Sequence, residues 1–135
     1  VIMIMSKYIL PENDIIRTAN WISNFLIREG YHIDYTLQSL KEIDKFFKEK
    51  INKILENDDN SRNFIFAIAT YIGEIIKMHF DGKWVISREV DLDDEAIGID
   101  FKNHSTIYPL NITLELIQKQ YTLEQYIKEN FNTDI

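Results

Sequence analysis

The chain has 135 residues, of which 45% are hydrophobic and 27% are charged, and these values are typical of a single globular domain spanning residues 1–135. It contains no cysteine, which excludes disulfides, thiolate metal sites and cysteine nucleophiles. The formal net charge of −7 disfavours binding to nucleic acid or to an anionic membrane surface, because both attract lysine and arginine.

The N-terminus carries an apolar stretch, residues 1–5, that is too short for a signal peptide and has no basic residue before it. It fits a short edge strand and a leftover leader equally well. No run of about 18 apolar residues follows, so we expect no membrane span and a cytoplasmic location.

Two amphipathic helices are predicted first, because apolar residues recur at helical spacing in both segments. Asn13 or Asp14 is expected to cap the first helix, which Gly30 ends. Thr36 is expected to cap the second helix, which the polar stretch 57–60 ends.

A third helix is predicted from about Arg62 to His79, with Ser61 as its N-cap. It is apolar on nearly every side, which is typical of a central helix covered by other elements. Gly73 lowers the stability of such a helix, so we expect a packing reason for it, namely the close approach of another backbone.

After a turn at residues 81–82 the hydrophobic period changes from that of a helix to that of a strand. An antiparallel meander is predicted, with strands over 84–88, 97–102 and 106–108. One or two C-terminal helices follow, the last opened by a capping box of Thr122 and Gln125. Helices, then strands, then helices indicate an α+β fold.

The loop between the first two strands is strongly acidic. Three of its residues, Asp91, Asp93 and Glu95, resemble the start of a calcium-binding loop, but Ala96 replaces the required glycine and Lys102 the terminal glutamate. We therefore predict a solvated acidic loop without a metal site. Its carboxylates are the predicted contact with a basic protein partner: Asp91, Asp93, Asp94 and Glu95.

Glu74 is the most unusual residue, since it lies in the most apolar helix and a buried carboxylate without donors is unfavourable. The guanidinium of Arg88 and the indole N–H of Trp84 are candidate donors. A structural tie between helix and strand is the favoured interpretation. The alternative is a ligand pocket or acid/base site formed by Glu74, Trp84, Tyr71 and Arg88.

From Ala69 to Pro109 the sequence contains a Tyr-x-Gly-Glu helix, a Gly-x-Trp strand start and a proline ahead of the last helices. This pattern resembles a family of small uncharacterised bacterial domains over roughly residues 37–120. Ala69 stands where that family has its first glycine, and residues 118–120 lack its lysine-arginine-leucine run. The resemblance implies a compact α+β fold and no particular chemistry.

The three histidines have no metal-ligand spacing and the four glycines form no phosphate loop, so no catalytic residue, metal or cofactor is predicted. The sequence favours a non-enzymatic interaction module, such as an acidic immunity-type or inhibitor protein. A small enzyme or ligand-binding domain using Glu74 is one alternative. A phage-type DNA mimic or anti-defence protein is the other.

Overall fold

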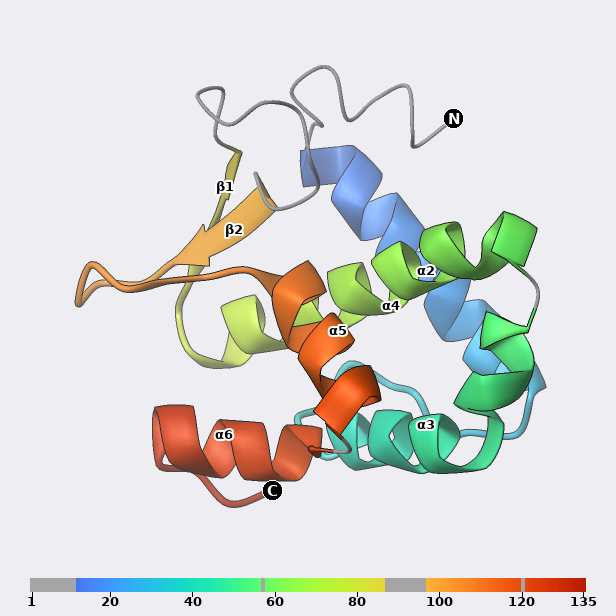
Figure 1. Ribbon diagram of the computed structural model, residues 1–135. Helices are drawn as coiled ribbons and strands as arrows, with labels where there is room; N and C mark the ends of the chain where they lie inside the picture. Colours follow the sequence, from blue (N-terminus) through green and yellow to red (C-terminus); the bar gives the residue numbers. More distant parts are fainter. Residues whose placement is uncertain (1–11, 57, 87–96, 120) are drawn as a thin grey trace.

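The computed structural model describes residues 12–56, 58–86, 97–119 and 121–135. This part of the chain forms five helices and a three-stranded sheet, which confirms the predicted α+β class (Figure 1). The helices are α2 (Glu12–Arg28), α3 (Ser39–Leu55), α4 (Asp58–His79), α5 (Pro109–Lys119) and α6 (Leu123–Phe131). The strands are β1 (Lys83–Ile86), β2 (Ile97–Asp100) and β3 (Thr106–Ile107). Residues 1–5 and the acidic loop lie outside the described residues.

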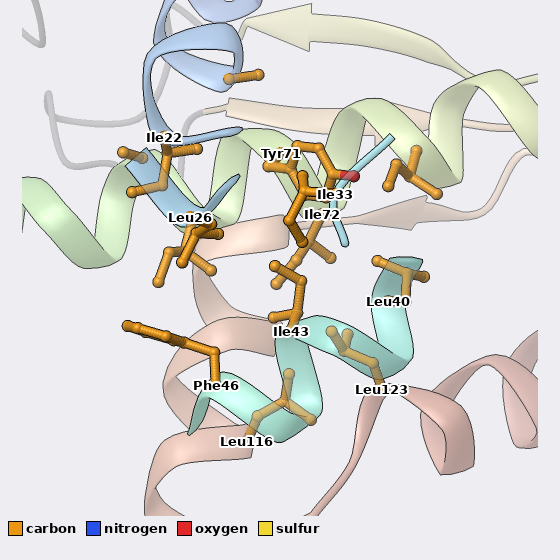
Figure 2. Close-up of a cluster of buried hydrophobic side chains, with 14 of the residues drawn as sticks. Ile22, Leu26, Ile33, Leu40, Ile43, Phe46, Tyr71, Ile72, Leu116 and Leu123 are labelled. Atoms are coloured by element: carbon orange, nitrogen blue, oxygen red, sulfur yellow. The ribbon is translucent and has the colours of Figure 1, made fainter. Parts of the chain in front are cut away.

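Helix α4 is central, as its composition predicts. Every residue from Phe64 to Ile76 is buried, and α2, α3 and α5 all pack against it. The main core gathers side chains from all five helices, including Leu26 of α2, Ile43 of α3 and Leu123 of α6 (Figure 2). Removing this apolar surface from water is the main source of stability.

The sheet is an antiparallel meander in the order β1-β2-β3, as predicted, although β2 and β3 end earlier than expected. Trp84 pairs with Ile99, and Ile86 with Ile97. The buried face of the sheet adds a second, smaller core in which Trp84 and Ile99 pack with Ile15 and Phe66. The sheet therefore packs against the first turn of α2 and the middle of α4.

The predicted end of the first helix at Gly30 is confirmed, since α2 ends at Arg28 and Gly30 has a left-handed φ of 99°. The capping box of Thr122 and Gln125 at α6 is present. Helix α2 begins at Glu12, so Asn13 and Asp14 lie in its first turn rather than at its N-cap. Acidic residues are favourable there because of the helix dipole.

The starts of α3 and α4 also differ from the predictions. Thr36 does not cap α3, which begins at Ser39, because the Thr36 hydroxyl donates to Asp34 within the preceding turn. Helix α4 begins at Asp58, so Ser61 lies inside it rather than before it.

Among the described helices, none combines the length and the hydrophobicity that a membrane span requires.

Helix α6 has a second cap from a residue far away in sequence. The carboxylate of Asp44 on α3 accepts hydrogen bonds from the backbone N–H groups of Leu123 (2.7 Å) and Glu124 (3.2 Å). These are unpaired amides of the first turn, which favour a negative charge. Burial outweighs the two bonds, and it raises the pKa of Asp44 to about 6.

Asp44 should make the stability of the protein depend on pH. Because its pKa is higher in the folded protein than in the unfolded chain, its contribution to the unfolding free energy should fall as pH rises from about 4 to about 6. Chemical denaturation across this range should show the decrease, and Asp44→Asn should remove it. Carboxyl NMR of the folded protein provides the direct check, and a midpoint for Asp44 near 4 would contradict the prediction.

Candidate functional site

The predicted site residues Glu74 and Trp84 meet in the protein interior. Glu74 lies on α4 and Trp84 on β1, and each is only 7% exposed. The Trp84 indole N–H donates to Glu74 Oε1 at 2.9 Å. Lys77, one turn further along α4, places its Nζ 3.3 Å from Glu74 Oε2. Both carboxylate oxygens therefore have partners, which removes most of the cost of burying them.

Gly73 makes this arrangement possible. A Cβ atom at Gly73 would lie 2.4 Å from the Cη2 atom of the Trp84 ring and 2.8 Å from Cγ of Pro109. The expected packing reason for this glycine exists, but a tryptophan ring and a proline ring approach it rather than another backbone. Gly82 is also tightly packed, since a Cβ there would lie 2.6 Å from a methyl carbon of Ile99.

Tyr71 does not join the Glu74 pair, although it lies only one turn away. Its hydroxyl is 2.7 Å from Ser39 Oγ and accepts a hydrogen bond from the backbone N–H of Tyr35 at 3.1 Å. Burial raises the pKa of Tyr71, so the phenol stays neutral. It fixes the connection between α2 and α3, in which Tyr35 adopts a left-handed φ of 64°.

The space beside Trp84 is too small for a ligand. The cavity there has a volume of about 10 Å³, which is enough for one water molecule at most. Its lining residues are Phe66, Ala69, Thr70, Trp84, Ile97, Pro109 and Leu110. The geometry thus favours a structural role for the contact between Glu74 and Trp84 over the alternative prediction of a ligand pocket. Arg88, the other candidate donor, lies outside the described residues.

The four carboxylates predicted to contact a partner, Asp91, Asp93, Asp94 and Glu95, also lie outside the described residues. The structure does describe the strands on both sides of them, which end at the paired residues Ile86 and Ile97. Among the described residues, no group of three or more histidine, aspartate or glutamate side chains is placed to hold a metal ion.

A groove between α2 and α4 was not predicted from the sequence. It has a volume of about 650 Å³ and includes Trp21, which is 54% exposed. The buried stripe of α2 consists of Ile15, Ala19, Ile22 and Leu26. Trp21 precedes Ile22 by one residue and so lies about 100° around the helix. This offset from the buried stripe indicates, from the sequence alone, that Trp21 lies at the edge of the buried face of α2.

Comparisons with family models, curated proteins and solved structures gave no match to this chain.

The hydrogen bond between Trp84 and Glu74 should contribute measurably to stability. Trp84→Ala should lower the unfolding free energy by about 3–5 kcal/mol, because it removes a buried ring as well as the bond. Trp84→Phe keeps an aromatic ring but leaves Glu74 Oε1 without its donor, at a cost of about 1–3 kcal/mol. Chemical denaturation measures both values.

A double-mutant cycle separates the bond from the packing. Trp84→Phe should cost less when Glu74 is already changed to Leu, because no buried carboxylate then loses its donor. Equal costs in the two backgrounds would show that the ring, and not the hydrogen bond, contributes the stability.

Proposed function

We propose that the protein is a non-enzymatic interaction module, of the immunity or inhibitor type, that binds a basic protein partner. The observation that carries the proposal is the position of the charge. Residues 89–95 contain five carboxylates and no basic residue, so this one stretch accounts for five of the seven excess negative charges. Charge of one sign concentrated in this way steers a partner of opposite charge.

The framework around this stretch is well suited to present it. Trp84 of β1 and Ile99 of β2 are buried in the second core, and the register of the two strands is maintained up to Ile86 and Ile97. Binding segments are commonly placed between rigid elements, because a fixed framework lowers the ordering cost on association.

The remaining charges are close to balance. Several described carboxylates lie next to a lysine, as in the pairs Glu29–Lys50, Glu115–Lys119 and Asp134–Lys128. Exposed pairs of this kind contribute little to stability, but they neutralise the local field. The attraction for a basic partner is therefore expected to come mainly from the stretch 89–95.

The alternatives have less support. An enzyme or ligand-binding site at Glu74 needs a free carboxylate oxygen and space beside it, whereas both oxygens are paired and the cavity is about 10 Å³. A DNA mimic needs rows of carboxylates, whereas lysines alternate with the acidic residues along α3.

We also propose a cytoplasmic site of action and a distant relationship to the family of small bacterial domains described above. The motif that carries the resemblance has a physical role in this chain. Gly73 admits the Trp84 ring, Glu74 accepts its N–H, and Pro109 covers the same position. Chains that share these residues are expected to share this packing arrangement.

Neutralising the acidic stretch should slow association with the partner. The variant replaces four carboxylates by their amides: Asp91→Asn, Asp93→Asn, Asp94→Asn and Glu95→Gln. After a pull-down has identified the partner, surface-immobilised binding kinetics should show association about tenfold slower at low salt. The difference should shrink at high salt, because salt screens the attraction.

A matched control separates local from overall charge. It neutralises four exposed carboxylates elsewhere: Glu29→Gln, Glu115→Gln, Glu124→Gln and Glu129→Gln. This control has the same net charge as the test variant and should slow association much less. If both variants slow it equally, the stretch has no special role and the proposed interface is wrong.

A further inference from the structure

The groove between α2 and α4 has the size and lining of a small-molecule site. Its volume of about 650 Å³ lies within the range usual for ligand pockets. It is lined by Arg17, Thr18 and Trp21 of α2 and by Asn60, Asn63, Phe64 and Ala67 of α4. All seven residues belong to two helices that pack directly against each other.

The length of the groove limits what can occupy it. The lining residues of α4 run from Asn60 to Ala67, which is about 10 Å at a rise of about 1.5 Å per residue. Those of α2 run from Arg17 to Trp21, which is about 6 Å. A docked helix uses anchors spread over about two turns, or about 10 Å, which is longer than the α2 wall. A ligand of about two fused rings matches these dimensions.

The apolar walls are aromatic. Trp21 is 54% exposed and stacks with Phe25, with ring centroids 6.4 Å apart. Phe25 contacts Phe64 edge-on, with centroids 5.3 Å apart, so the three rings form one supported cluster. A planar aromatic ligand gains binding energy by stacking on an indole face. Because the ring cluster supports Trp21, little side-chain movement is needed to present that face.

The polar groups of the groove favour a negative charge on the ligand. Arg17 is the one charged residue of the lining, and no carboxylate lines it. The guanidinium lies 3.5 Å from the partly buried Asp14, but Arg17 itself is exposed and has further N–H donors available. In the described part of the chain, the side-chain amides of Asn60 and Asn63 make no hydrogen bond, so they can donate to the ligand.

From this arrangement we infer that the groove binds a planar aromatic carboxylate of about two rings. The rings stack on Trp21 above Phe64 and Ala67, and the carboxylate faces Arg17. This site is separate from the acidic stretch, and it does not depend on the proposed partner.

The test uses two probes of nearly equal shape, 2-naphthoate and the neutral 2-naphthalenemethanol. Amide chemical shifts of the ¹⁵N-labelled protein are followed as each probe is added. Saturable shifts should be confined to the neighbourhood of residues 17–21 and 60–67, with the carboxylate binding about tenfold more tightly than the alcohol. Trp21→Ala should weaken both probes by about tenfold.

The charged contact has its own matched pair of variants. Arg17→Gln should abolish the preference for the carboxylate, whereas Arg28→Gln, an exposed position on the same helix outside the groove, should retain it. Shifts that do not saturate, or that map elsewhere, would overturn the inference. Equal affinity for the two probes, or equal effects of the two arginine variants, would overturn it as well.

Discussion

The hydrogen bond from Trp84 to Glu74, made directly over Gly73, is the contact on which the arrangement of the elements depends. It joins the central helix α4 to the first strand of the sheet, and Pro109 at the start of α5 packs on the same glycine. Three elements therefore meet within a single helical turn. The carboxylate of Glu74 is buried, and the fold tolerates it there because a tryptophan N–H and a lysine both reach it.

The neighbouring turn of α4 organises the other side of the molecule. Tyr71 uses its hydroxyl to fix the connection between α2 and α3, and Ile72, Ile75 and Ile76 contribute to the main core. Because both cores include side chains of α4, the sheet and the helices share one support. A substitution that destabilises α4 is therefore expected to weaken both cores, as in the cooperative unfolding of a small domain.

The order and type of the elements followed from hydrophobic periodicity, and the tie between Glu74 and Trp84 followed from the cost of an unpaired buried carboxylate. The helix starts at Glu12, Ser39 and Asp58 did not follow, because several polar residues compete to cap or to form turns nearby. Two features depend on tertiary structure alone. Asp44 caps a helix about 80 positions away, and Trp21 borders a groove that exists only where α2 crosses α4. Local patterns do not show which elements pack together, although the offset of Trp21 from the buried stripe of α2 is visible in the sequence.

One tryptophan of the chain is buried and the other is exposed, so their intrinsic fluorescence can report on two different parts of the molecule. Trp84 is enclosed by aliphatic and aromatic side chains with its N–H bonded to a carboxylate, whereas Trp21 is 54% exposed. We therefore expect Trp84 to emit at shorter wavelength and to be protected from a soluble quencher, and Trp21 to emit at longer wavelength and to be accessible to it. Fluorescence of the unmodified chain thus distinguishes events at the sheet from events at the α2–α4 surface without an added label.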